Sequence, residues 1–249
     1  MQSASARKRW EMLYKTYYRE SDPFDKKNKA RITEWEAVYN SFTINPARYP
    51  TLIDFGCGSG HFALNFLKKG FEVTGMDISK EGLHILKQRA HTYNCSTKLH
   101  TVHSGLYTRL KSLEGRYDAG CMIVTYHCIS NKREEQKKVF MNFIRLIKKN
   151  GKVLIMEPNP LNPLFYLYYT FLCRTNQEDG FNTRNSKKEL VISLLKESGM
   201  KDIQISYHSF LPTFLINRWN FVKKINMFLC VIPLVRNFSA FYLITAVKN

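Results

Sequence analysis

From residue 51 onward, apolar residues follow two alternating patterns along the chain. One pattern is a short continuous apolar run, which has the length of a buried β-strand. The other repeats apolar residues every three or four positions, as amphipathic helices do. Strands that alternate with helices predict βαβ units and a parallel sheet with right-handed crossovers. The predicted strands cover 52–55, 71–76, 98–103, 118–125 and 152–156, and the predicted helices cover 61–69, 80–93 and 133–149.

Further elements are predicted on both sides of this alternating region. Helical spacing of aromatic residues at 5–22 and at 28–42 indicates helices before the first strand. After the fifth strand, the stretch 186–198 is predicted as a helix that begins with a serine cap and ends before a glycine. Two strand-like runs follow, at 203–207 and 241–247.

Two segments do not follow the alternation. Residues 161–173 are almost wholly apolar and aromatic, and residues 210–235 mix apolar side chains with basic ones. We expect both segments to pack against the core or to line an apolar pocket. The alternative is contact with a membrane surface, because apolar segments with basic residues also bind lipid headgroups.

The run from Asp54 to Gly60 carries the strongest chemical signal. An apolar strand ends there in three glycines, and a helix follows. Glycine lets a ligand approach the backbone closely, and a helix N-terminus offers free N–H groups, so this loop suits a nucleotide-like ligand. His61 stands where a dinucleotide-binding loop has Gly or Ala, and no Gly-Lys-Ser/Thr follows as in a P-loop. A nicotinamide-dependent oxidoreductase is therefore disfavoured.

Asp77 is the second signal, because it ends the strand that follows the glycine loop. A carboxylate at this position can accept hydrogen bonds from both hydroxyls of a ribose. The structural alternative is an aspartate that caps the following helix. With the glycine loop upstream, ribose binding is the interpretation that we adopt.

The glycine loop and Asp77 together resemble the class I S-adenosylmethionine-dependent methyltransferases, whose loop has the form D-x-G-x-G-x-G and whose second strand ends in an acidic residue. The resemblance covers roughly 48–158 and extends more loosely to 183–208. It implies a Rossmann-like α/β fold, with a seven-stranded, mostly parallel sheet, helices on both faces and an antiparallel last strand. It also implies one methyltransferase domain over 1–249, with an N-terminal helical lid at 1–45, the cofactor-binding core at 48–158, and an apolar, helical insert with the rest of the sheet at 159–249.

The same resemblance implies the contacts of the cofactor, S-adenosylmethionine. Asp54 and the glycine loop flank its methionine moiety, Asp77 holds its ribose, and Ile78 lies against its adenine. The family often has an acidic residue after the third strand, and here Ser104 or a backbone group is expected to take its place. Thr125 ends the predicted fourth strand, where the family places cofactor and substrate contacts. The loop residues are Gly56, Cys57, Gly58 and Gly60.

Candidate acceptor-site residues surround this region. Methyl transfer to a hydroxyl requires removal of a proton, and His127 is the candidate general base because the ordinary pKa of histidine is about 6.5. Its alternative is a structural histidine that bonds the backbone. Glu157 and Asn159 follow the fifth strand and are predicted to contact the acceptor, or else to form a rigid turn. Tyr14 and Tyr18 are predicted to contact the acceptor from the lid, and they equally suit a helix packed on the sheet.

Composition adds a strongly basic charge. Lys and Arg number 38 against 20 Asp and Glu, which gives a net charge of +18 that attracts nucleic acid, anionic lipids or phosphorylated substrates, or simply aids solubility. The six cysteines show no C-x-x-C or zinc-ligand spacing, so free thiols in a reducing cytoplasm and no metal are expected. The polar, basic start and the lack of a long apolar run predict a cytoplasmic protein, with peripheral contact to an anionic membrane as an option.

Three hypotheses remain for the acceptor. A small-molecule or lipid-like acceptor, methylated on oxygen or nitrogen, is favoured by the apolar segments and the aromatic content. A nucleic-acid acceptor is favoured by the charge alone. A non-catalytic protein that binds S-adenosylmethionine is the third hypothesis, and the intact loop and Asp77 argue against it.

Overall fold

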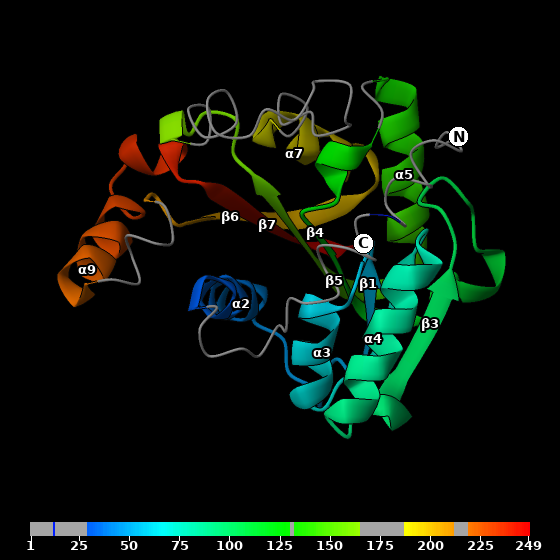
Figure 1. The fold of residues 1–249 in the computed structure, drawn as a ribbon. Coiled ribbons are helices and arrows are strands. Elements are labelled where there is room, and N and C mark those ends of the chain that lie inside the picture. Colours follow the sequence, from blue (N-terminus) through cyan, green and yellow to red (C-terminus); the bar gives the residue numbers. More distant parts are fainter. Residues whose placement is uncertain (1–11, 13–28, 130–131, 165–186, 212–218) are drawn as a thin grey trace.

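A mixed sheet of seven strands forms the centre of the structure, a computed structural model that describes residues 12, 29–129, 132–164, 187–211 and 219–249 (Figure 1). The strands lie in the order β3-β2-β1-β4-β5-β7-β6. Strands β1 to β5 pair in parallel, and β7 pairs antiparallel with both β5 and β6. The predicted Rossmann-like sheet with its antiparallel last strand is confirmed. The strands are β1 Thr51–Phe55, β2 Glu72–Asp77, β3 Leu99–His103, β4 Tyr117–Ile123, β5 Ile147–Pro158, β6 Met200–His208 and β7 Phe241–Lys248.

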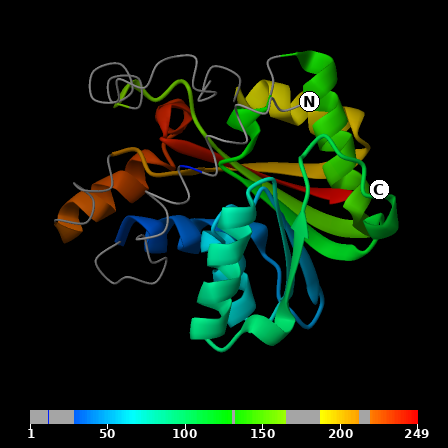
Figure 2. The ribbon, with the colours of Figure 1, turned by 45° about the vertical axis from the view of Figure 1, so that its right-hand side comes forward.

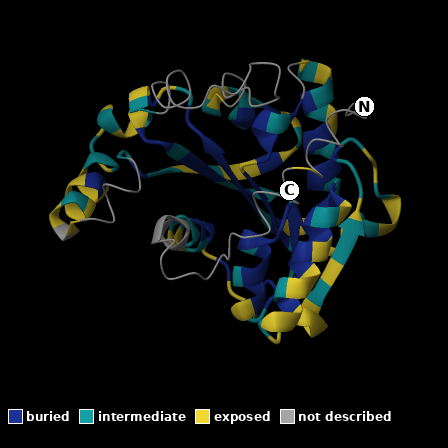
Figure 3. Ribbon diagram, viewed as in Figure 1, coloured by how far each residue is buried: buried dark blue, intermediate teal, exposed yellow. Residues whose placement is uncertain are grey.

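Helices cover both faces of the sheet (Figures 1 and 2). Helices α2, α3 and α4 form one apolar cluster with sheet residues such as Leu52, and α5 and α7 form the other with residues such as Ile53. Successive strand residues point to opposite faces, so the two neighbours contribute to different clusters. Figure 3 shows the central strands mostly buried between these two layers, whereas the edge strands β3 and β6 are partly exposed. The helices are α2 Lys29–Phe42, α3 His61–Lys68, α4 Lys80–Thr92, α5 Arg133–Leu146, α7 Lys188–Glu197 and α9 Asn220–Leu229.

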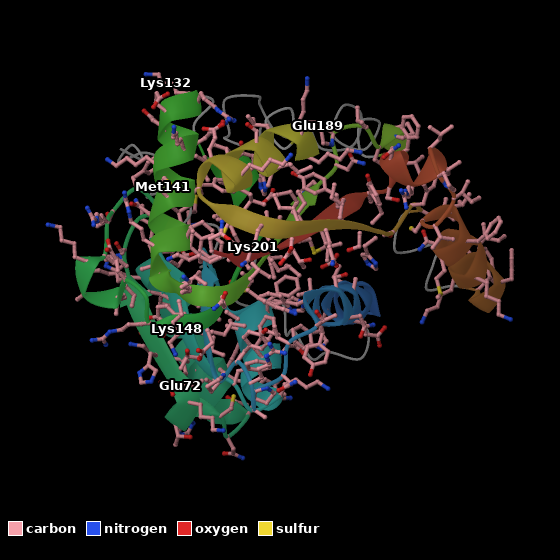
Figure 4. All side chains as sticks on the ribbon, turned by 180° about the vertical axis from the view of Figure 1, so that it is seen from behind. Glu72, Lys132, Met141, Lys148, Glu189 and Lys201 are labelled. Carbon is pink, nitrogen blue, oxygen red and sulfur yellow. The ribbon has the colours of Figure 1, made fainter. Side chains whose placement is uncertain are left out.

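The carboxyl ends of the parallel strands meet at one edge of the sheet, where ligands of open α/β sheets bind. The last strand begins at the same edge, because β7 is antiparallel to β5 and its Phe241 pairs with Pro158. The glycine loop, Asp77, the β4–α5 connection and the segment that precedes β7 therefore share this edge. Figure 4 views the layer of α5 and α7 from behind, with Met141 on α5 and Glu189 on α7.

Two predicted boundaries were wrong at the fourth and fifth strands. Strand β4 ends at Ile123 and not at Thr125, because Val124 takes a positive φ of 51° that breaks the extended backbone. The predicted helix 133–149 ends at Leu146, and Ile147 already pairs with Tyr117 as part of β5. Residues 147–149, which the sequence pattern predicts as the last turn of the helix, instead belong to strand β5, which pairs with β4.

The predictions for the later segments have mixed outcomes. Helix α7 is present, but its N-cap is Lys187 without a side-chain cap bond, so the predicted serine cap was wrong. Most of the apolar segment 161–173, and the helix predicted at 5–22 apart from Met12, lie outside the described residues. The expected packing of 210–235 against the core was wrong for α9, whose apolar side chains are largely exposed. Among the described helices, none has both the length and the apolar content needed to cross a bilayer.

Candidate active site

The loop between β1 and α3 needs glycine at its first and last turns. Gly56 has a φ of +90°, and a Cβ atom there would lie 2.4 Å from Cγ2 of Thr125. Gly60 caps α3 with a φ of +83°, and a Cβ atom there would lie 2.2 Å from Cδ1 of Leu86 and 3.2 Å from its Cβ. Both positions therefore exclude larger residues on two grounds, the backbone conformation and the contact. The result is a tight turn at the carboxyl edge of the sheet.

Side chains from β2 and α4 fix this loop in place. One carboxylate oxygen of Asp77 accepts from the N–H of Gly58 at 2.8 Å, and the other accepts from the N–H of Ser79 at 2.8 Å. From α4, Nη1 of Arg89 donates to the carbonyl oxygen and the hydroxyl of Ser59, each at 3.1 Å. Asp77 is thus held rigidly beside the loop, and Ser79, not Asp77, accepts the capping bond of α4 from Gly82.

Gly60 offers a direct stability test of the loop. We expect Gly60→Ala to lower the free energy of unfolding by about 3 kcal/mol or more, because strain at positive φ adds to overpacking against Leu86 in α4. The matched control is Gly199→Ala, at a φ of +80° with nothing within 4 Å of the added Cβ, which carries the strain alone at about 1 kcal/mol. Urea unfolding of both variants measures the difference, and equal losses would contradict the close packing of the loop.

Asp54 is a buried acid directly below the glycine loop. Its side chain is 3% exposed and accepts a bond from the thiol of Cys121 at 3.6 Å. Burial raises the pKa of Asp54 to about 7, and the nearby carboxylate of Asp77 adds to this, while bonds from Cys121 and the backbone of Ala63 oppose it. Cys57 of the loop is also buried, and burial raises the pKa of its thiol. Asp54 is therefore poised to ionise near neutral pH when a positive group approaches.

Ile78 and Ser104 lie next to each other beyond the ends of β2 and β3. The N–H of Ser104 donates to the carbonyl oxygen of Asp77 at 3.0 Å, and Nε2 of His103 donates to the carbonyl oxygen of Ile78 at 2.9 Å. Both residues are half-buried. The two predicted adenine contacts are thus brought together beside Asp77.

Glu157 ties the end of β5 to the connection that follows β4. One carboxylate oxygen accepts from the N–H groups of Thr125 at 2.7 Å and Tyr126 at 2.6 Å. The other accepts from the N–H of His127 at 3.3 Å and from its Nδ1 at 2.9 Å. Glu157 is 0% exposed, so four donors surround a fully buried carboxylate. This arrangement sets the position of Thr125, whose hydroxyl donates to the carbonyl oxygen of Gly56 at 3.3 Å.

His127 lies inside the protein, with 1% of its surface exposed. Burial disfavours its charged form, but the interactions with Cys128 and with the carboxylate of Glu157 outweigh burial and raise the pKa of His127 above its ordinary value. Nδ1 of the buried imidazole is held by Glu157 at 2.9 Å. This geometry suits a positioning role, and the predicted removal of an acceptor proton stays a prediction.

Both the nitrogen and the oxygen of the Asn159 side-chain amide form hydrogen bonds within the protein. Its Nδ2 donates to the carbonyl oxygens of Asn237 at 2.7 Å and Ser239 at 2.8 Å, and its Oδ1 accepts from the N–H of Leu161 at 3.1 Å. The geometry resembles the predicted rigid turn more than an acceptor contact. It also connects the end of β5 to the segment that leads into β7.

Two residues of this region were not predicted from the sequence. The hydroxyls of Tyr126 and Tyr242 are fully buried near Glu157 and make no hydrogen bond. Burial and the nearby carboxylate of Glu157 raise the pKa of both phenols, so both stay neutral. Tyrosine is common in apolar runs, and only the packing of Tyr126 against Phe140 of α5 shows that its hydroxyl is enclosed.

Some predicted site residues cannot be placed. Tyr14 and Tyr18 lie outside the described residues, so their predicted contacts stay predictions. Within the described part of the chain, no group of three or more His, Cys, Asp or Glu side chains is arranged to hold a metal ion.

Comparisons with known proteins find similarity to methyltransferases. A family model described as "Methyltransferase domain" matches residues 52–151. A ubiquinone biosynthesis O-methyltransferase from Vibrio campbellii is 30% identical over 109 residues, which are 43% of this chain and 43% of that protein. The chain thus matches half or less of the length of such curated relatives.

Solved structures share the fold over most of the chain. A SAM-dependent methyltransferase from Archaeoglobus fulgidus superposes with a TM-score of 0.61 at 17% identity, covering 95% of this chain and 99% of that one. The [4+2]-cyclase SpnF also superposes with a TM-score of 0.61, at 15% identity and with 92% and 85% of the two chains covered. The fold alone therefore does not specify the reaction.

Proposed function

We propose that the chain is a class I S-adenosylmethionine-dependent methyltransferase, which binds S-adenosylmethionine at the glycine loop and transfers the methyl group to a small-molecule or lipid-like acceptor. The observation that carries the proposal is that the Asp77 carboxylate is hydrogen-bonded to the glycine loop and held beside it. A Cβ atom at Gly56 or Gly60 would clash, and Asp77 bonds both Gly58 and Ser79. A carboxylate oxygen accepts two hydrogen bonds, so this arrangement suits ribose hydroxyls as well.

The other proposed cofactor contacts follow the same edge of the sheet. When bound, S-adenosylmethionine supplies a methyl group on a positively charged sulfonium. Asp54 carries the negative charge that faces the methionine end, and Ile78 and Ser104 form the adenine side. Thr125 closes the loop from β4, held by Glu157. We assign the core 48–158 to the cofactor and 159–249 to the acceptor side, and the lid at 1–45 stays a prediction.

His127 and Glu157 are proposed as positioning residues. Their bonds to each other and to the β4–α5 backbone hold this connection in place beside the proposed cofactor and acceptor sites. An acceptor with an ionisable hydroxyl or a neutral amine can then lose its proton to water or to another group. Precise placement of two reactants contributes much of the rate in such displacements.

The affinity for S-adenosylmethionine is expected to depend on pH through Asp54. Because burial raises the pKa of Asp54 to about 7, acidification below that value protonates the free protein and removes the charge that attracts the cationic methionine end. We expect the affinity to fall by about tenfold from roughly pH 6.5 to roughly pH 5.5. Calorimetry across this range measures it, and Asp54→Asn serves as the control that flattens the profile. A wild-type affinity that stays constant would contradict the proposed contact.

The acceptor class is proposed from the relative named for ubiquinone biosynthesis and from the apolar surface described below. Incubation with methyl-labelled S-adenosylmethionine and separate pools of lipid extract, polar metabolites and RNA tests it. Label in the lipid or metabolite pool supports the proposal, and label in RNA favours the alternative suggested by the +18 charge. Binding of cofactor without label in any pool favours a non-catalytic protein.

A further inference from the structure

Exposed apolar side chains concentrate in one segment of the described chain. Of the twelve large apolar residues that are exposed, eight lie between 219 and 238. Figures 1 and 3 show this segment as α9 and the turns after it, at the periphery and away from the two helical layers. We name six of these eight exposed side chains the α9 surface: Trp219, Phe221, Ile225, Phe228, Val231 and Leu234.

One polar side chain anchors the inner side of helix α9. Asn226 is 6% exposed, and its Oδ1 accepts from the N–H groups of Phe210 at 2.6 Å and Leu211 at 2.9 Å. At about 100° per residue, Phe228 and Phe221 lie about 200° and 220° around the helix from Asn226. They are 64% and 60% exposed, so the helix is anchored by an amide while its apolar face points outward.

The charged side chains of this segment of the sequence are all basic. Lys223 and Lys224 are exposed on α9, and Arg236 follows it. From residue 203 to residue 249 the sequence contains no Asp or Glu, in a chain of net charge +18. An apolar helix face flanked by lysines, with a Trp at its start, is the pattern of helices that lie in the plane of a membrane surface. A helix of ten residues is about 15 Å long, which is about half of the thickness of a hydrocarbon core.

We propose that the α9 surface docks this protein onto a bilayer that contains anionic lipids. Phe221, Ile225 and Phe228 enter the boundary between headgroups and acyl chains, and the lysines contact the anionic headgroups. The helix lies in the surface and does not span it.

The docked surface is tied to the candidate active site. Asn162, just beyond β5, donates through Nδ2 to the carbonyl oxygen of Phe238, and Asn159 donates to those of Asn237 and Ser239. This segment leads into β7, whose first residue, Phe241, pairs with Pro158 at the carboxyl edge of the sheet, where the glycine loop also lies. Docking thus holds that edge near the bilayer. The further step, that the methyl acceptor is drawn from the bilayer, rests on the proposed function.

Vesicle sedimentation of the full chain tests the docking. We expect binding to vesicles of phosphatidylcholine with phosphatidylserine and much weaker binding to phosphatidylcholine alone. The variant Lys223→Gln/Lys224→Gln is expected to bind the anionic vesicles about 25-fold more weakly, at about fivefold for each lysine. The variant Phe221→Ser/Ile225→Ser/Phe228→Ser is expected to lose at least about tenfold on the same vesicles. The matched control is Lys138→Gln/Lys201→Gln, which removes two exposed lysines outside the α9 surface and is expected to bind nearly as the wild type does.

The outcomes separate this inference from the proposed function. No binding to anionic vesicles would overturn the docking, as would binding that is equally weakened by the control pair. Self-association that the serine variant abolishes, without vesicle binding, would overturn it in favour of a second copy of the chain. Affinity for S-adenosylmethionine is measured on the same preparations. Vesicle binding without cofactor binding would refute the methyltransferase proposal alone, and cofactor binding without vesicle binding would refute the docking alone.

Discussion

Asp77→Asn is expected to weaken the binding of S-adenosylmethionine by about a hundredfold, which is the loss of two hydrogen bonds to a charged acceptor. The carboxylate sits at the end of β2 with its two oxygens fixed by Gly58 and Ser79. An asparagine presents one oxygen and one NH₂ group, so it cannot accept from both backbone groups and from both ribose hydroxyls. Calorimetric titration of the variant measures the effect.

The control for this prediction is Asp202→Asn, which makes the same chemical change at an exposed position of β6. Asp202 has a φ of 52°, a conformation that asparagine tolerates, so the control should keep its fold and its affinity. Circular dichroism establishes whether Asp77→Asn is folded at the temperature of the titration. A folded Asp77→Asn protein with wild-type affinity would show that Asp77 only supports the loop.

Glu157→Gln is expected to lower the free energy of unfolding by about 3 kcal/mol and to weaken cofactor binding as well. The carboxylate accepts from three backbone N–H groups and from the imidazole of His127. The NH₂ group of glutamine accepts none of these, so two buried donors lose their partners in either orientation of the amide. Thr125, which packs against Gly56, loses its anchor at the same time.

Urea unfolding measures this loss, with Glu189→Gln as the control. Glu189 has a side chain that is 67% exposed, so its substitution is expected to change the unfolding free energy by less than about 0.5 kcal/mol. His127→Asn separates the two interpretations of the histidine. If His127 is a positioning residue, the variant has lower stability and lower cofactor affinity. Unchanged stability and affinity with no methyl transfer would instead support His127 as a general base.

The fold was predictable because the signals that specify it are local. Apolar runs separated by amphipathic stretches predicted every strand and the helices from α2 to α7, and glycines at 56, 58 and 60 marked the loop before α3. Asp77 was placed by its position at the end of β2. Such features depend on neighbours in sequence, and the sheet brings them together by topology alone.

What the sequence did not reveal depends on contacts between distant segments. Glu157 is 30 residues from His127, and nothing in either sequence neighbourhood indicates that they form a buried pair. The burial of Asn226, on the inner side of α9, likewise depends on the backbone of Phe210 and Leu211. The apolar content of 210–235 suggested a core segment, because a hydrophobic pattern gives the spacing of a face but not what it faces.

The most direct test of the central claim is a calorimetric titration of the purified chain with S-adenosylmethionine and, in parallel, with NAD. A related fold also serves a [4+2]-cyclase, so cofactor binding has to be measured on this chain itself. The account predicts that S-adenosylmethionine binds with micromolar or tighter affinity at one site and that NAD does not bind. Absence of S-adenosylmethionine binding, or a preference for NAD, would contradict it.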